Sequence, residues 1–274
     1  TWSQSAICDC GCFEATGLGG ILLSLPYADI NQVINANGLR LILVQGMPSA
    51  WGVAAKAMME YKSLDFMLGP QIPMGKNSEL LAWSGTNSAP VVAWNDETPL
   101  NRWDDILLLL ERLAPKKPLV PDSMAERIAL FGIGHAICGE LGFGWNRRLG
   151  MMPTPDDGKA LSAFAVKYGY RDADVNLANA RVIAFMTELA ATLKAQRERG
   201  SNYIIGQSVT AADFYWAAFS NFVVLQSRED ILLAPALRPV FEQTSADVVA
   251  AVDPILLEHR DRIMRSYFTL PLAL

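Results

Sequence analysis

The sequence has little that would support metal, phosphate or nucleic-acid chemistry. It contains only two histidines: His135, which is expected to be a core residue, and His259, which is expected at the surface or an interface. It shows no Gly-x-Ser-x-Gly motif, no glycine-rich phosphate loop and no histidine pair at metal-ligand spacing, which excludes the enzyme classes that those motifs mark. Acidic residues outnumber basic ones, 28 against 23, so the formal net charge is −5 and little positive charge is left to neutralise a phosphate backbone. We therefore expect no metal cofactor and no nucleic-acid partner.

Long apolar runs and an N-terminal targeting pattern are also missing. The longest apolar stretches, such as 19–25 and 106–110, fall far short of the roughly 20 residues that cross a membrane. No Lys or Arg precedes Arg40, so the start has neither the basic region of a secretory signal nor an Arg-rich transit peptide. We expect no membrane span and a cytoplasmic protein, with an organellar location after removal of a presequence as the open alternative.

Cysteine is scarce and unevenly placed. Three of the four cysteines lie in the run CDCGC, at Cys8, Cys10 and Cys12. Neighbours this close are awkward to join by disulfides, and zinc sites usually use Cys-x2-Cys spacing with a fourth ligand, which is not evident here. A loosely packed N-terminal extension over residues 1–37 is therefore favoured over a metal site. Cys138 is expected to be buried as a small apolar residue.

What the sequence does have is an apolar, globular composition and a change of pattern near its middle. Hydrophobic residues make up 51% of its 274 residues and charged residues 19%, enough for a sizeable core. Residues 38–115 alternate strand-like and helix-like segments, 116–122 combine prolines with charge as a linker does, and 123–274 read as helical. These are the domain boundaries that we predict.

The first domain reads as β-α-β-α-β-β-α. Strands are predicted at 39–45, 65–72, 89–95 and 98–103, with helices after the first, second and fourth. In the second domain the residues from 172 to 199 form the clearest helix, because one apolar stripe runs along it: Val182, Phe185, Met186, Leu189 and Leu193. A helix is also predicted between 124 and 150, and others follow Thr210.

This order of elements resembles the glutathione transferase superfamily, over roughly residues 39–270. Ala89-Pro90 opens the third strand as the cis-proline of that family does, although by position alone a trans proline is the commoner arrangement. The stretch GQSVTAADFYWAAF looks like the family's buried helix start, with Thr210 and Asp213 as a capping box. The C-terminal stretch 253–274 is similar to that of bacterial transferase-like proteins of unassigned substrate. The resemblance implies a thioredoxin-like α/β domain followed by an all-α domain.

The resemblance also implies where glutathione would bind. In the family a Ser, Cys or Tyr after the first strand hydrogen-bonds the sulfur of glutathione. Here Met47 occupies that position, and a thioether cannot donate a hydrogen bond. Ser49 is the nearest hydroxyl and lies at a helix start, where it would act as the activator or only as the helix N-cap. The backbone at Ala89, with Pro90, would pair with the peptide-like part of glutathione.

The other site residues depart further from the family pattern. Arg102 and Trp103 occupy the positions of the Glu-Ser pair that holds the γ-glutamyl end; Arg102 can bind a carboxylate, but Trp103 has no hydroxyl. An apolar substrate pocket is expected around Met47, Trp51, Trp145 and Tyr215, although such side chains more often belong to a core.

These features lead to two hypotheses. In the first, the protein is a glutathione S-transferase-like enzyme that joins glutathione thiolate to a small apolar electrophile in an interdomain cleft. In the second, it is an inactive binding or assembly subunit that keeps the fold and has lost glutathione activation, as Met47 and the pair Arg102 and Trp103 suggest. The resemblance implies a homodimer or larger assembly in either case.

Overall fold

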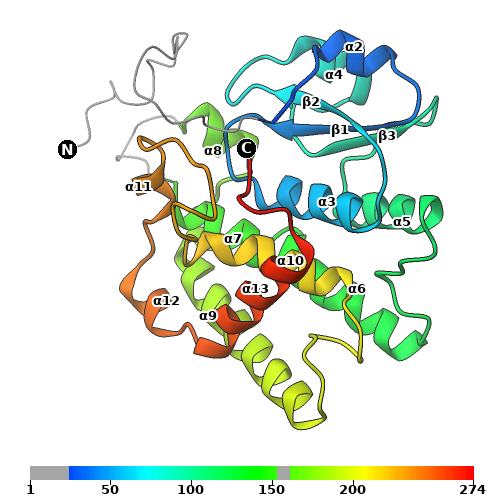
Figure 1. The fold of residues 1–274 in the computed structure, drawn as a ribbon. Coiled ribbons are helices and arrows are strands. Elements are labelled where there is room, and N and C mark those ends of the chain that lie inside the picture. The colour runs from blue at the N-terminus through cyan, green and yellow to red at the C-terminus, as the bar shows by residue number, and fades with distance from the viewer. Residues whose placement is uncertain (1–24, 153–160) are drawn as a thin grey trace.

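The structure is a computed structural model, and it describes residues 25–152 and 161–274. The chain forms a small sheet with helices on both faces, followed by an all-helical domain (Figure 1). This is the predicted fold class. Cys8, Cys10 and Cys12 lie outside the described residues, as does most of the predicted extension.

The sheet has three strands, in the order β2-β1-β3. β1 (Leu39–Val44) runs parallel to β2 (Met67–Gln71) and antiparallel to β3 (Val91–Trp94). Leu41 and Ile42 point to opposite faces and both are fully buried. The central strand is therefore covered on two sides, which explains why its sequence is apolar at every position from Leu41 to Val44 rather than alternating.

Two helices cover each face of the sheet (Figure 1). α2 (Ile30–Asn35) and α4 (Ser78–Ser84) lie on one face, around a core that contains Ile42. α3 (Ala50–Tyr61) and α5 (Trp103–Leu113) lie on the other, between the sheet and the helical domain. This second face is the side of the first domain that contacts the helical domain.

α2 lies within the stretch assigned from the sequence to an N-terminal extension. Its Val33 is fully buried against the sheet, and the Ala28 N–H donates to the Leu68 carbonyl. Residues 25–37 thus pack on the first domain. The domain boundaries drawn from the sequence stay predictions.

The fourth predicted strand, at 98–103, is not a strand. Leu100 forms only an isolated bridge with Val92, through two backbone hydrogen bonds of 2.7 and 2.8 Å. α5 begins at Trp103, so too few residues separate the turn from the helix for a full strand to pair. The hairpin pattern was correct for the turn and wrong for the length of its second arm.

The second domain is helical throughout. α9 (Asp172–Glu198) is the long helix that the sequence predicted. Four residues of its predicted stripe are buried, Val182, Met186, Leu189 and Leu193, and the fifth, Phe185, is half-buried. The remaining helices are α6 (Met124–Cys138), α7 (Phe143–Gly150), α8 (Ala163–Lys167), α10 (Ala211–Phe219), a 3-10 turn at Ser220–Phe222, α11 (Arg238–Phe241), α12 (Ala246–Ala250) and α13 (Pro254–Tyr267).

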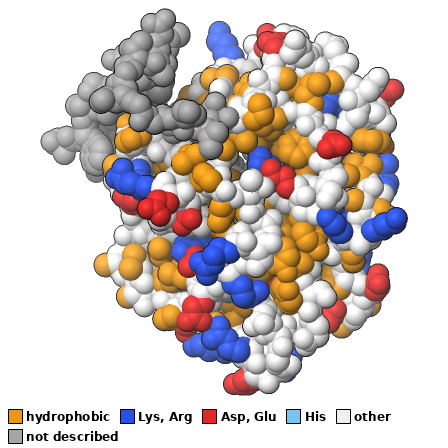
Figure 2. Space-filling model, in the orientation of Figure 1, with side chains coloured by type: hydrophobic (Ala, Val, Ile, Leu, Met, Phe, Trp, Pro, Cys, Tyr) orange, Lys and Arg blue, Asp and Glu red, His pale blue; other side chains and the backbone are white. Residues whose placement is uncertain are grey.

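By length and composition, the stretch Met124–Gly150 would pass as one membrane-spanning helix. The chain between 139 and 142 interrupts it, and the resulting helices, α6 and α7, pack against α10 and α9. On the face shown in Figure 2, hydrophobic side chains are interspersed with charged and other polar ones. Residues 124–150 therefore form two packed helices of the helical domain.

α10 is the centre of the helical domain, because every one of its residues is buried. It packs against α6 and α13 in its own domain and against α3 in the first domain. Its N-terminus has the predicted capping box: the Thr210 N–H donates to the Asp213 carboxylate at 2.8 Å. The same carboxylate accepts from the Ile204 N–H at 2.9 Å, and His259 Nε2 lies 3.0 Å from it.

We expect replacement of Asp213 by Asn to destabilise the protein strongly. The amide nitrogen cannot accept a hydrogen bond, so one buried N–H or hydroxyl at the start of α10 is left unpaired. The free energy of unfolding should fall by about 2–4 kcal/mol, measured by urea titration. Asp122→Asn, at an exposed position before α6, is the control and should change it by less than about 0.5 kcal/mol. Equal midpoints for the two variants would contradict this role of Asp213.

Candidate functional site

A cavity of about 710 Å³ lies between the two domains. The first domain contributes the turn between β1 and α3, which carries Met47 and Ser49, and the segment before β3, which carries Ala89. The helical domain contributes Arg148, Tyr168 and several apolar side chains. Three of the residues singled out from the sequence therefore meet at one cavity, although they are up to 42 positions apart in the chain.

Ser49 is the N-cap residue of α3, but its hydroxyl makes no capping hydrogen bond. Only its carbonyl serves the helix, by accepting from the Val53 N–H at 2.9 Å. The first N–H groups of a helix have no partner inside the helix. The Ser49 hydroxyl lines the cavity and can donate to an anion or a polarised sulfur there, and the nearby N-terminus of α3 favours negative charge.

Met47 and Trp51, the other predicted residues of this turn, have different surroundings. Met47 is half-buried and lines the cavity, as predicted. The Trp51 indole instead enters the helical domain, where its N–H donates to the Cys138 carbonyl at 2.9 Å and its ring meets Phe219 edge-on. The indole does not close the corner beside Ser49, and its outer face carries the Arg148 guanidinium, 4.4 Å from the ring centre.

The peptide bond between Ala89 and Pro90 is cis. Ala89 lines the cavity, and its backbone N–H and C=O make no hydrogen bond with another described residue. At the end of β2, the buried Gln71 side chain donates to the Asn87 carbonyl at 3.2 Å and so fixes the loop before Ala89. A free extended backbone edge of this kind can pair with a peptide.

Arg102 and Trp103 do not line this cavity. Arg102 is exposed, and Asp104, together with Asp105, holds its guanidinium in ion pairs of 2.8 and 3.4 Å. These acids also raise the pKa of Arg102. Trp103 turns into the helical domain and packs over Gly134, edge-on to Tyr215. A Cβ at residue 134 would lie only 2.6 Å from the Trp103 ring, so the absence of a side chain at Gly134 leaves room for the indole.

Two further predicted pocket residues lie elsewhere. Tyr215 is 2% exposed and belongs to the core of the helical domain, where its hydroxyl faces the Trp103 carbonyl at 3.4 Å. Trp145 packs edge-on against Tyr168 in a smaller cluster of apolar side chains. Tyr168, which the sequence analysis did not single out, is the ring of this pair that reaches the cavity.

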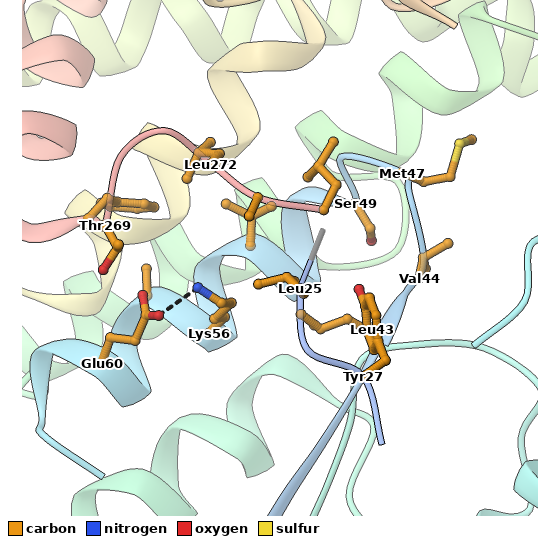
Figure 3. Close-up of a pocket in the computed structure, with 16 residues that line it drawn as sticks. Leu25, Tyr27, Leu43, Val44, Met47, Ser49, Lys56, Glu60, Thr269 and Leu272 are labelled. Atoms are coloured by element: carbon orange, nitrogen blue, oxygen red, sulfur yellow. Dashed lines mark hydrogen bonds and ion pairs between the residues drawn. The ribbon is translucent and has the colours of Figure 1, made fainter. Parts of the chain in front are cut away.

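A second, water-sized pocket of about 20 Å³ is also lined by Ser49 (Figure 3). It is lined by α3, by Tyr27 and by the C-terminal residues 268–274, which lie across α3. The Tyr27 hydroxyl is buried without a partner among the described residues, and burial raises its pKa to about 12. Tyr27 therefore stays a neutral donor beside Ser49. The sequence analysis missed it because it lies in the presumed extension.

The two histidines exchange the places expected from the sequence. His135, predicted to be a core residue, is exposed on α6. His259, predicted to be at the surface or an interface, is 4% exposed and faces Asp213. Neither lines the cavity, and the described part of the chain has no group of three or more His, Cys, Asp or Glu side chains that could hold a metal ion.

Comparisons with known proteins identify the fold. No protein-family model matches the chain, and the search of curated proteins finds no match. Among solved structures, a glutathione S-transferase from Methylobacterium radiotolerans in complex with glutathione sulfonate matches with a TM-score of 0.59 at 18% identity. The match covers 87% of this chain and 97% of that one.

Two further structures give the same result. Ure2p in complex with S-hexylglutathione matches with a TM-score of 0.59 at 12% identity, over 84% of this chain and 95% of its own. Rice GST1 in complex with glutathione matches with a TM-score of 0.58 at 16% identity, over 86% and 93%. These likenesses show the fold: a thioredoxin-like domain followed by an all-helical domain, as in glutathione transferases.

Cys138 is the one cysteine among the described residues, and it is expected to be unreactive. Burial, followed by the nearby negative charge of Asp104, holds the pKa of its thiol well above the usual range. At pH 8 the thiolate fraction is therefore negligible. Iodoacetamide should modify Cys138 at least about tenfold more slowly in the native protein than in guanidinium, as read from its peptide by mass spectrometry. Equal rates would show that Cys138 is accessible and would reopen it as a nucleophile.

Proposed function

We propose, from the premise that the chain has the glutathione transferase fold, that it binds glutathione in the interdomain cavity and transfers its thiolate to an apolar electrophile. The observation that carries this proposal is the position of two unused groups at one cavity: the Ser49 hydroxyl and the backbone of Ala89 beside a cis proline. The structures of similar fold that contain glutathione or its analogues support it.

The chemical fit of the cavity supports the same proposal. Its volume of about 710 Å³ is in the range of sites that hold small molecules. The extended backbone at Ala89 would pair with the peptide part of glutathione, which places the sulfur toward the turn between β1 and α3. The lining includes apolar side chains of the helical domain, Phe222 and Val240 among them, which suit the electrophile.

In the proposed mechanism, the Ser49 hydroxyl donates a hydrogen bond to the sulfur of glutathione. A hydrogen bond to the charged form favours thiolate over thiol, and the N-terminus of α3 adds to this effect. The thiol proton passes to water, and the thiolate forms a bond to the electrophilic carbon as the leaving group departs with its electron pair. Met47 contributes no hydrogen bond to this step and borders the sulfur position as an apolar neighbour.

A second candidate function is a binding or assembly subunit without catalysis. Two observations favour it: Met47 stands where an activating hydroxyl is expected, and Arg102 with Trp103 lies away from the cavity. The γ-glutamyl end would then lack the side chains that the family resemblance implies. The fold and the cavity are the same in both candidates, so the reaction itself must separate them.

The decisive measurement is glutathione binding by titration calorimetry, followed by conjugation to a chloronitroarene. We expect binding, and we expect Ser49→Ala to lower the rate of conjugation at neutral pH by about tenfold to a hundredfold, since a hydrogen bond to a charged group is lost. The loss should shrink at high pH, where the thiol ionises without help. Ser123→Ala is the matched control, because Ser123 is also an N-cap residue without a capping hydrogen bond, at an exposed site.

The other outcomes separate the candidates. Absence of heat at millimolar glutathione would refute glutathione binding. Binding without conjugation would establish the non-catalytic candidate. Equal rates for Ser49→Ala and wild type would remove Ser49 from the mechanism.

We also propose that the protein is a homodimer. Met124 and Ile128 lie one turn apart on α6, and each is 67% exposed, which is unusual for large apolar side chains unless a partner covers them. Light scattering after size exclusion should give twice the chain mass for the wild type and the mass of a single chain for Ile128→Glu. A monomeric wild type would refute this assembly.

A further inference from the structure

Among the described residues, the helical domain supplies the cavity with positive charge and no negative charge. Arg148 at the end of α7 and Lys167 at the end of α8 both line it, and none of the described residues that line it is Asp or Glu. Unbalanced positive charge in a partly apolar cavity is unfavourable without an anion. The sequence analysis did not single out either residue.

Arg148 is held in place while its N–H groups stay unused. Its guanidinium carbon lies 4.1 Å from the centre of the Tyr168 ring and 4.4 Å from that of Trp51. It forms no ion pair and no hydrogen bond with any described residue. Cation–π contacts use the faces of the guanidinium, so no described residue occupies its N–H fork, which has the geometry to bind a planar carboxylate.

The neighbouring Arg147 shows what a structural arginine looks like at this place. Its guanidinium donates to the carbonyls of Phe222 and Gln243, at 2.8 and 3.2 Å, and to the Thr244 hydroxyl at 3.1 Å. It is 3% exposed and ties α7 to the segment before α12. Arg147 thus has internal acceptors, whereas Arg148, one residue later, has none among the described residues and faces the cavity.

Lys167 extends this positive wall to the rim of the cavity. Its ammonium group lies 3.4 Å from the Asn87 carbonyl, across the gap between the domains. Burial lowers the pKa of Lys167, and repulsion from Arg148 lowers it further. The two cations therefore repel each other, with no acid from the described part of the lining between them, and an anion bound there would relieve that repulsion.

We propose that Arg148 and Lys167 bind the carboxylate of an apolar organic acid whose body lies against Met151, Phe222 and Val240. This deepens the proposed function by naming the class of its second substrate, an acidic electrophile. It rests on that function only for the reaction, because binding of the acid requires no glutathione. The alternative source of a carboxylate, glutathione itself, is separated from it by the experiment.

The test compares two ligands that differ only in charge, 4-phenylbutyrate and 4-phenylbutyramide. Calorimetry on the full chain at pH 7, without glutathione, should show at least about tenfold tighter binding of the acid. Arg148→Gln should reduce that preference to less than about twofold, and Lys167→Gln should reduce it about threefold, while the affinity for the amide stays unchanged. Arg127→Gln is the matched control, since Arg127 also covers a ring, Phe131 at 5.2 Å, outside this cavity.

Two further arms keep the proposal falsifiable. If Arg148→Gln does not fold, the wild-type preference for the acid should still weaken in about 0.5 M sodium chloride, where exposed charges are screened. With saturating glutathione present, the preference should persist. Its disappearance would assign the cations to a carboxylate of glutathione and overturn the proposal, as would equal affinities of the wild type for acid and amide. Preference for the acid without any glutathione binding would refute the proposed transferase and leave this inference standing.

Discussion

The structure depends on one buried carboxylate at the start of a fully buried helix. The polar N-terminus of α10 cannot reach water, so its donors must be satisfied inside the protein. Asp213 does this by accepting from the Thr210 N–H and hydroxyl and from the Ile204 N–H. Since His259 on α13 faces the same carboxylate, three separate segments converge on one side chain. Asp213 thus allows the N-terminus of α10 to be buried, and α6 and α13 pack against α10.

The same helix sets the position of the cavity. α10 packs on α3, and its Phe219 receives the Trp51 ring at a centre-to-centre distance of 4.6 Å. This contact is close because residue 144 is glycine: a Cβ there would lie 2.4 Å from the Phe219 ring. Trp51 follows Ser49 by two residues, so the packing that anchors the indole also fixes the start of α3 and the direction of its free N–H groups. The site is thus held by hydrophobic contacts on the side away from the ligand.

Local patterns in the sequence predicted the parts of the fold that local physics decides. The sequence alone predicted three such features: the apolar segment of β1, the stripe of α9, and the capping box at Thr210 and Asp213. Each depends on residues that lie only a few positions apart. The sequence did not predict that His135 is exposed and His259 buried, because the burial of His259 depends on the packing of α13 against α10. Arg148 and Lys167 were not predicted as site residues for the same reason. A single basic residue near a helix end is common, and only the packing of the two domains places these two at a cavity.

The division of labour between the domains follows from these contacts. In the first domain, the groups that line the cavity are backbone and uncharged side chains, the Ser49 hydroxyl among them. The two side chains predicted to lie at the γ-glutamyl end point elsewhere, Arg102 to its own acids and Trp103 into the helical core. Backbone groups recognise a peptide without selecting among its side chains. The groups that can discriminate by charge and shape, Arg148 with its two aromatic neighbours and Lys167 at the rim, stand on the helical domain. On our proposals, specificity in this protein is therefore a property of the second domain, and a change in α7 or α8 should alter the choice of ligand without disturbing the turn that holds the sulfur.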